Sequence, residues 1–428
     1  MRRLLSSTAL YGVILGSLTP ALAFADPVTI AVATAASVSA AVAVGTPLAM
    51  TLVLTHLAVN TAIQFVAQSL APKPPNLAGL GIGGGTRSAG YGVSGLAPVG
   101  DRAIIYGQTR VGGVVIYKEA TDNNKFLHIV VALAGHECEE ITTVFLNDEA
   151  LTLDGSGNAT APSKYNGKVR IKSALGTNTQ VADPDLVSES AGLWTADHRL
   201  LGVTYVYARL EFDADAFPNG EPNITALVKG KKVLNPNTGS VAFSENSALI
   251  LRDYLTSDFG LSAESTDIDD TAFITAANVC DEDVALAAGG TEKRYTTNGT
   301  FTTGSKPKDA IDALLRPMGG TIWYAQGKWR VKASAYTSPT LSFSEDDLLS
   351  GLTIQTRHSR RDNYNIVKGT FRGPETNFQQ SDFPQIKSDS FITVDNSLEQ
   401  SIDLDLGFTN TSTRAQRIAK IALFRNRE

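Results

Sequence analysis

The residues of this sequence that could do chemistry lie in three short acidic stretches and one glycine-rich stretch. The first runs from His136 to Glu140 and carries a histidine, a cysteine and three glutamates, side chains that can bind zinc. It departs from the His-Glu-x-x-His zinc motif, because the last position is Glu140 and not a second histidine. An acidic loop is therefore the favoured interpretation, and a metal site is the alternative.

The other stretches give weaker signals. The turn Asp154–Asn158 lacks the spaced ligands and the final glutamate of an EF-hand, so a β-turn is favoured over a calcium loop. Asp267, Asp269 and Asp270 precede a helical pattern, where carboxylates complement the helix dipole. No Lys-Ser/Thr follows the glycines of residues 79–85, which indicates a linker and not a phosphate loop.

The remaining polar candidates are better explained by structure than by chemistry. His128 and His198 are isolated, and the basic stretches 229–233 and 354–361 are typical of solvated turns and strands. A cell-wall hydrolase is one hypothesis for the function, but no convincing acid/base pair supports it. We assign no catalytic, cofactor-binding or metal-binding residue and expect a protein that is not an enzyme.

Composition places the chain among globular proteins. It has 428 residues, of which 43% are hydrophobic and 19% charged, and this length suggests two to four domains. The net charge of −6 and the pI of about 5.5 argue against a nucleic-acid clamp, so we expect no specific nucleic-acid binding. Cys138 and Cys280 are expected to be buried thiols, and a disulfide is expected only if the chain is exported.

The first part of the chain, residues 1–72, reads as an apolar helical segment. Arg2 and Arg3 precede an apolar run that ends at Ala25, as in a signal peptide, and no charged residue occurs from Pro27 to Pro72. Three interpretations stay open: a helical hairpin buried in the centre of an oligomer, a membrane-active segment, or a cleaved signal followed by one anchor.

A Gly/Pro-rich linker, residues 73–97, leads into a β-rich region that we place at residues 98–243. Short β-branched and aromatic runs separated by Gly, Asn and Asp predict successive antiparallel strands. The strongest signal is residues 202–212, and the alternation in Lys168–Lys172 is typical of an exposed edge or face strand. Gly107 marks a place where the backbone must bend or approach a neighbour closely.

Residues 244–340 predict an α+β domain. Helical patterns cover residues 248–255, 271–280 and 308–315, a strand is expected at 294–301, and a hairpin at 320–333. We expect Trp323 and Trp329 of this hairpin to pack on the preceding helix.

Residues 341–428 predict the start of a further β-rich domain that ends in a helix. Strands are expected at 363–371 and within 388–406, and Thr411 or Ser412 is expected to cap the helix. Its apolar stripe, residues 415–423, has no predicted partner, which suggests a fragment or a chain that continues. The expected fold class is α+β and β-rich, with several small β-barrel-like or sandwich-like and mixed α/β domains after the apolar segment.

An ordered series of motifs resembles the tail hub proteins of long-tailed phages and prophages, of the lambda tip-attachment type. The resemblance covers roughly residues 75–428, and Leu70–Pro75 also matches the end of the apolar start of such proteins. The motifs are Ile105-Tyr-Gly-x-x-Arg-Val-Gly-Gly113, Leu127-His-Ile-Val-Val-Ala-Leu-Ala-Gly-His-Glu137, Ile141-x-x-Val-x-Leu-Asn-Asp148, and segments 247–256, 276–282, 294–299, 317–323 and 415–427.

The resemblance implies a structural protein of the virion tail tip, present in the host cytoplasm during assembly. It implies a homotrimeric hub that closes the tail tube, connects the distal tail ring to the central fibre or receptor-binding part, and opens for tape-measure protein and DNA. The implied partners are the distal tail protein, the tape-measure protein, other tail tip proteins and a distal fibre, with host-membrane contact through the apolar N-terminus. The alternative is an exported, signal-peptide-bearing β-rich envelope or surface binding protein, which cleavage after Ala25 would favour.

Overall fold

The computed structural model describes residues 95–96, 100–339, 341–347, 351 and 363–427. The predicted apolar segment 1–72, most of the linker 73–97 and the basic stretch 354–361 lie outside these residues. The chain divides into residues 1–76 and residues 77–428, and all that follows concerns the second unit. Among the described residues, no helix is both long and apolar enough to cross a membrane.

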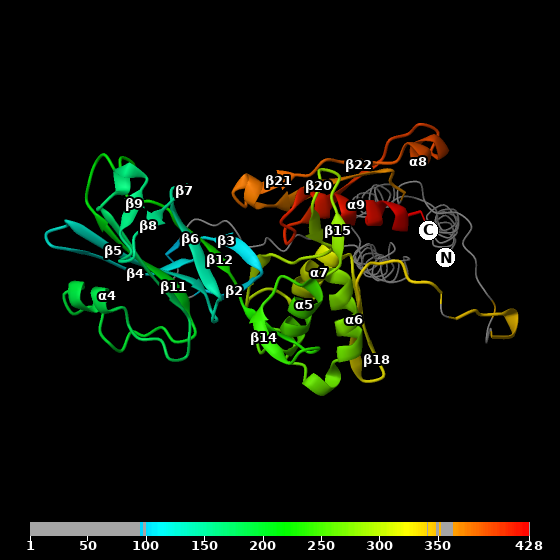
Figure 1. The fold of residues 1–428 in the computed structure, drawn as a ribbon, viewed down its shortest axis with the longest axis horizontal. Coiled ribbons are helices and arrows are strands. Elements are labelled where there is room, and N and C mark those ends of the chain that lie inside the picture. The colour runs from blue at the N-terminus through cyan, green and yellow to red at the C-terminus, as the bar shows by residue number, and fades with distance from the viewer. Residues whose placement is uncertain (1–94, 97–99, 340, 348–350, 352–362, 428) are drawn as a thin grey trace, which may run out of the picture. The chain divides into compact units, whose positions relative to one another are not determined.

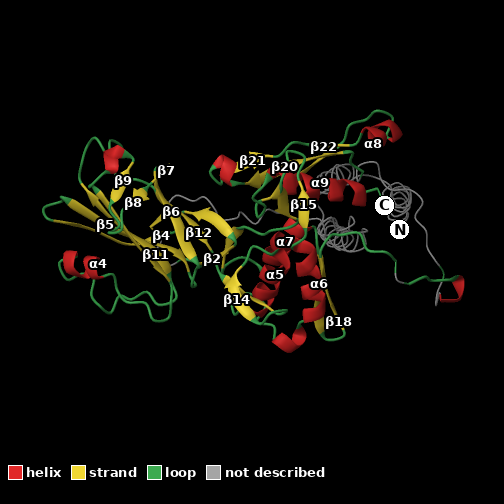
Figure 2. Ribbon diagram, in the orientation of Figure 1, coloured by secondary structure: helices red, strands yellow, loops and turns green. Residues whose placement is uncertain are grey.

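Two sheets face each other in the first part of this unit and enclose an apolar core (Figures 1 and 2). The larger has the order β1 (Gly95–Leu96), β4 (Val114–Thr121), β5 (Phe126–Ala134), β11 (Thr204–Glu211) and β10 (Val169–Leu175). The smaller has the order β3 (Gln108–Val111), β12 (Ile224–Lys229), β6 (Glu140–Leu146) and β7 (Glu149–Ala150). Neighbouring strands are antiparallel apart from β1 and β4. Both sheets are open at their edges, so the arrangement is sandwich-like and the barrel-like expectation is wrong for the described residues.

Strand β11 shows how sequence alternation builds this core. Val206, Ala208 and Leu210 point into the space between the sheets, because successive side chains of a strand alternate between its faces. Tyr205 and Tyr207 point to the opposite face, where they are buried in a second cluster. The cover there includes α4 (Pro184–Glu189), which supplies Leu186 to the cluster. The predicted faces of this strand are confirmed, and both of them are buried.

A larger apolar core lies in the second part and unites helices and strands from residues 104 to 423. Its helices are α5 (Ser247–Thr256), α6 (Asp270–Cys280), α7 (Pro307–Leu315) and α9 (Ser412–Arg425). Its strands include the hairpin β18 (Thr321–Ala325) and β19 (Lys328–Lys332), and a sheet of β20 (Ile366–Arg372), β21 (Gln380–Asp382), β22 (Ile386–Lys387) and β23 (Ser401–Leu406). Side chains of the predicted domains 244–340 and 341–428 contribute to this one core.

Local sequence signals set the ends of these helices. Asn246 caps α5 by accepting hydrogen bonds from the N–H groups of Ala248 and Leu249, as expected for an Asn at this position. Asp269 caps α6, and Thr411 caps α9. Pro307 begins α7, where its missing N–H costs nothing.

Strand β2 (Ala103–Tyr106) belongs to both halves of the described unit. It pairs with β17 (Gly299–Thr302) in antiparallel register, although almost two hundred residues separate them. Ile104 and Tyr106 enter the larger core, whereas Ile105 enters the sandwich core. Gly107 follows directly at φ +61°, and a Cβ there would lie 2.2 Å from the Thr297 carbonyl oxygen, so the predicted close approach is confirmed.

The other elements are short hairpins and single turns. The hairpins are β8 (Thr152–Leu153) with β9 (Ala159–Ala161), β13 (Lys232–Asn235) with β14 (Ser240–Phe243), and β15 (Asp283–Ala285) with β16 (Thr291–Lys293). The turns are helix α8 (Asp389–Val394) and the 3-10 helices η2 (Ser163–Tyr165), η3 (Ser265–Asp267), η4 (Arg316–Met318), η5 (Glu345–Asp347) and η7 (Pro374–Thr376).

Two predicted strands are partly wrong. The strand expected at 294–301 begins only at Gly299, because Thr297 and Asn298 donate their N–H groups to the carbonyls of Glu245 and Phe408 and not to a neighbouring strand. The alternating stretch 388–406 contains α8, which Ser388 caps by accepting from the N–H of Phe391, and only its end is strand β23.

Two packing predictions also differ from the structure. Trp323 is 42% exposed, because it lies on the outer face of β18, whereas Trp329 packs against the core from β19, which lies against α6. The apolar stripe of α9 does have a partner, because Ala415, Ile418 and Leu423 are buried in the larger core beside β20. The expectation that this stripe has no partner, on which the suggestion of a fragment or a continuing chain rests, is therefore wrong.

Candidate functional site

The acidic stretch after β5 has a structural use. His136 is buried, its Nε2 accepts a hydrogen bond from the Ile105 N–H at 2.9 Å, and its Nδ1–H donates to the Glu137 carbonyl at 2.8 Å. Burial lowers the pKa of His136 to about 4 and raises the pKa of Cys138 to about 12. The imidazole therefore stays neutral and anchors β2, and the thiol stays protonated.

The glutamates of this stretch point away from His136 toward lysines of the basic stretch 229–233. Lys229 Nζ lies 2.6 Å from Glu140, and Lys232 Nζ lies 3.1 Å from Glu137. Among the described residues, no three His, Cys, Asp or Glu side chains form a group able to hold a metal ion. The fold thus brings the acidic stretch 136–140 and the basic stretch 229–233 together through surface ion pairs.

The aspartates singled out from the sequence accept hydrogen bonds within turns and helix starts. Asp154 Oδ1 accepts from the N–H groups of Ser156 and Asn158, each at 2.8 Å, as in a β-turn. Asp269 caps α6 and accepts from Arg330 Nε at 2.9 Å. Asp270 pairs with Arg252 at 2.7 Å.

The isolated histidines are also held by neighbours. His128 lies in β5 with its ring nitrogens 2.8 Å from the hydroxyls of Thr121 and Tyr207, and burial lowers its pKa. His198 stacks on Trp194 with ring centroids 4.8 Å apart. The Thr195 hydroxyl lies 3.0 Å from His198 Nδ1, but among the described residues neither histidine ring is hydrogen-bonded to a carboxylate that would orient it as a base.

The sequence gives no hint of an ion-pair cluster that fastens α9 to the rest of the core. The Glu292 carboxylate on β16 lies 2.8 Å from Arg417 and 3.6 Å from Arg414, and its side chain is 9% exposed. It also accepts hydrogen bonds from the hydroxyls of Thr411 and Thr413. More than a hundred residues separate the partners, so only the fold brings them together.

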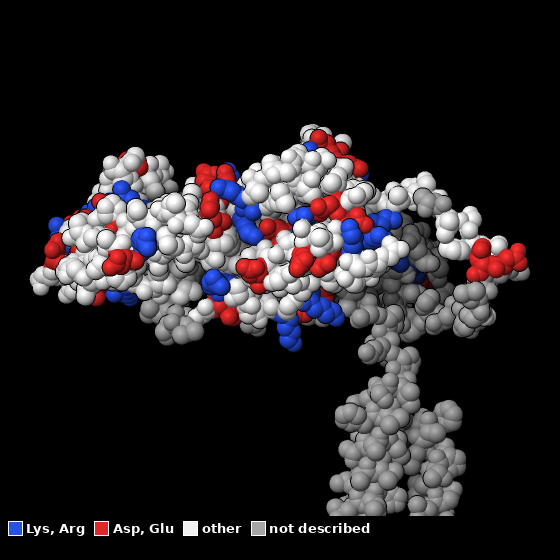
Figure 3. Space-filling view, turned by 90° about the horizontal axis from the view of Figure 1, so that it is seen from below, with Lys and Arg blue, Asp and Glu red and all other residues white. Residues whose placement is uncertain are grey.

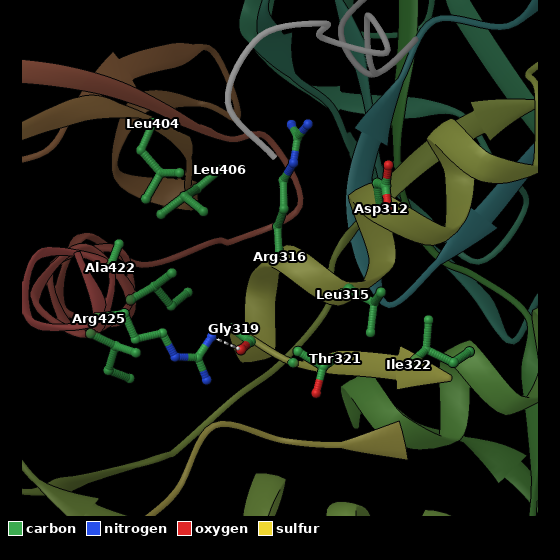
Figure 4. Close-up of a pocket in the computed structure, with 13 residues that line it drawn as sticks. Asp312, Leu315, Arg316, Gly319, Thr321, Ile322, Leu404, Leu406, Ala422 and Arg425 are labelled. Atoms are coloured by element: carbon green, nitrogen blue, oxygen red, sulfur yellow. Dashed lines mark hydrogen bonds between the residues drawn. The ribbon is translucent and has the colours of Figure 1, made fainter. Parts of the chain in front are cut away.

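A groove lined in part by α9 is a hollow in the described part of the chain that could receive a partner (Figure 4). One wall comes from the end of α7, from η4 and from the start of β18, and the other comes from β23 and α9. Its volume is about 170 Å³. The apolar lining is Leu315, Ile322, Leu404, Leu406, Ile418, Ile421 and Ala422.

Local sequence explains why the groove stays open at η4. Pro317 cannot continue α7, and Gly319 follows in the left-handed region at φ +52°, which lets the chain reverse into β18. A Cβ at Gly320 would lie 3.0 Å from the Lys332 carbonyl oxygen. The two glycines therefore keep this wall thin and close to β19.

Two arginines and one aspartate give the groove its charge. Arg425 donates to the Gly319 carbonyl at 2.9 Å and to the Ser334 hydroxyl at 2.8 Å. Arg316 donates to the Asp405 carbonyl at a long 3.5 Å, and its Nε is buried with no hydrogen-bond partner among the described residues. Burial raises the pKa of Asp312 on the same wall.

The size and chemistry of the groove suit side chains better than a cofactor. It is smaller than the about 300–1,000 Å³ typical of small-molecule sites. Its lining is apolar and its cations outnumber its single carboxylate. The arrangement can bind a short peptide segment that carries an apolar side chain next to acidic ones.

Comparisons with known proteins bear on the whole fold. No family model matches the chain. It is 24% identical over 224 residues to the tip attachment protein J of Escherichia phage SECphi27, a match that spans 48% of this chain and 18% of that protein. A chain in the structure of the virion of a native gene transfer agent particle superposes with a TM-score of 0.57 at 15% identity, covering 86% of this chain and 84% of that chain. The predicted resemblance to phage tail-tip proteins is confirmed, and the second match shows a shared fold.

Proposed function

We propose, on the premise of this resemblance to phage tail-tip proteins, that the chain is a structural component of a virion tail tip. In this proposal it forms a homotrimeric hub that closes the tail tube, joins the distal tail ring to the central fibre, and opens for tape-measure protein and DNA. The observation that carries the proposal is a fold shared with a virion chain over 86% of this chain, together with sequence similarity to a tip attachment protein. The partners are the distal tail protein, the tape-measure protein, other tail tip proteins and a distal fibre.

The surface chemistry supports a channel protein that does not hold DNA. Lysine and arginine are interspersed with aspartate and glutamate on the face seen in Figure 3. With 37 basic and 43 acidic residues, the chain carries no excess of cations to displace phosphate counterions. DNA passing a ring with such surfaces meets little attraction and slides through.

The polar groups support a role in assembly and not in turnover. His136 and Cys138 are buried, and the acidic residues nearby pair with lysines. The ion pair between Glu292 and Arg417 joins elements of one core. We therefore propose that the protein is not an enzyme and that its work is binding and conformational opening.

The test is the location of the chain in native particles. Negative-stain images with an antibody against the sandwich region should show label at the end of the tail distal to the capsid. Sedimentation of the purified full chain should give the mass of three copies. Label along the tail tube, on the capsid or on the host envelope would contradict the proposal, and cleavage after Ala25 would favour the exported protein instead.

A further inference from the structure

The segment that follows β19 exposes large apolar side chains. Tyr336, Leu341 and Phe343 are 90%, 68% and 77% exposed, and the exposed acids Asp346 and Asp347 follow them. We call residues 335–339 and 341–347 the arm. Apolar side chains gathered on one exposed segment mark a contact surface.

The groove between η4 and α9 has the complementary chemistry. Its apolar walls match the apolar side chains of the arm, and its volume of about 170 Å³ suits one or two of them. Arg316 and Arg425 lie where acidic residues next to those side chains would pair with them (Figure 4).

We propose that the arm of one copy docks in the groove of a second copy, with Phe343 or Leu341 between the apolar walls and Asp346 and Asp347 beside the two arginines. The inference rests on the proposed trimer and adds the contact that would build it. Arm and groove are different surfaces, so the contact is heterologous, and repeated by rotation it closes a ring.

The course of the arm favours a second copy over its own groove. Ser334 lies at the groove, where its hydroxyl accepts from Arg425, and the chain leaves from there. No turn occurs from Ala335 to Pro339, and a residue before proline, here Ser338, is restricted to extended conformations. The first part of the arm, residues 335–339, is therefore extended and leads away from Ser334.

A mixture of two variants of the full chain, each with one added cysteine, tests the contact. One variant carries Thr321→Cys at the exposed rim of the groove, and the other carries Ser342→Cys on the arm, which keeps both Leu341 and Phe343. The native Cys138 and Cys280 are buried, so the new thiols react first under mild oxidation. We expect a disulfide-linked dimer from the mixture, and none when Thr160→Cys replaces Thr321→Cys. Thr160 is also exposed, but it lies on the sandwich, whose core is separate from the core beside the groove.

The outcomes separate this inference from the proposed function. A trimer by sedimentation with no linked dimer beyond the control would overturn the inference and leave the hub standing. A linked monomer in the double variant Thr321→Cys/Ser342→Cys, with no linked dimer in the mixture, would assign the arm to its own groove and overturn it as well. A chain that sediments as a monomer at all concentrations would overturn both.

Substitutions in the arm test its chemistry without touching either core. Phe343→Ser should lower the yield of dimer linked through Ser342→Cys roughly tenfold or more, since a buried Phe contributes that much to association. Asp346→Asn with Asp347→Asn should lower it about three- to tenfold, and added salt should lower the wild-type yield similarly. Asp197→Asn with Asp215→Asn, two exposed acids on the sandwich, is the matched control and should change nothing. Equal yields in the arm and control variants would contradict the proposed pairing.

Discussion

The cluster around Glu292 makes a quantitative prediction about how α9 is held. Glu292→Gln keeps the size of the side chain and removes its charge. Arg414 and Arg417, whose side chains are 11% and 18% exposed, then lose the carboxylate that offsets their burial. Breaking one side of a buried ion pair costs about 3–5 kcal/mol. We expect about 3 kcal/mol, because the glutamine oxygen still accepts from the Thr411 and Thr413 hydroxyls.

Urea unfolding, followed by tryptophan fluorescence and circular dichroism, measures this loss. Urea m values of about 1–3 kcal/mol/M hold for small proteins and rise with chain size, so for this chain the midpoint should fall by about 1 M or less. Glu399→Gln is the matched control, because Glu399 pairs with Lys387 at 2.6 Å but both side chains are exposed, at 55% and 39%. That control should leave the midpoint unchanged. If the two variants shift the midpoint equally, burial of the cluster does not stabilise α9 and the reasoning is refuted.

Three further predictions concern groups described above. Burial lowers the pKa of His136 from 6.5 to about 4, so between pH 6.5 and pH 4 the unfolded chain binds more protons than the folded chain. The free energy of unfolding should therefore fall by about 3 kcal/mol as the pH drops from 6.5 to 4. His136→Gln should flatten this part of the profile of urea midpoint against pH, and an unchanged slope would exclude His136 as its source. Gly107→Ala should lower the free energy of unfolding in urea by more than about 2 kcal/mol, because the new Cβ would lie 2.2 Å from the Thr297 carbonyl oxygen. Gly167→Ala, at φ +73° in open space, should lower it by only about 1 kcal/mol. Equal losses would mean that the backbone near Thr297 moves aside to accept the Cβ. Cys138 and Cys280 are buried with pKa values raised to about 12, so a thiol reagent at pH 8 should label them only after unfolding, and rapid labelling of the native chain would contradict their burial.

Local sequence signals predicted the elements that depend on local physics. The helices capped by Asn246 and Asp269 begin within a residue of their predicted starts, because capping and apolar spacing act over a few residues. The faces of β11 followed from alternation alone. The hairpin at Gln326-Gly327 followed from its two-residue turn, where both residues have positive φ.

The groove could not be predicted, because its walls come from distant parts of the chain. Arg316 and Arg425 are unremarkable in sequence, and only the packing of α9 against η4 brings them to one hollow. The same holds for Glu292 and Arg417, which no periodicity connects. The stripe on α9 was recognised, but its partner β20 could not be, since a strand gives no signal of which helix will cover it.

The two-sided strand β2 sets a limit on how this protein can exchange parts with relatives. Ile105 fills the sandwich core while Ile104 and Tyr106 fill the other, and the pairing with β17 fixes all three in place. A recombination event that replaced everything from residue 100 to 243 as a cassette would import foreign side chains into the helical half. An exchange whose upstream junction falls just after Gly107 would leave Ile104 and Tyr106 in the chain that supplies the larger core. The incoming segment would then have to accept Ile105 in its sandwich core and to supply a side chain that replaces Val233 in the larger core. Natural mosaics of such proteins should therefore show their crossovers inside the segment between β2 and β3, at a place that no domain boundary drawn from composition would mark.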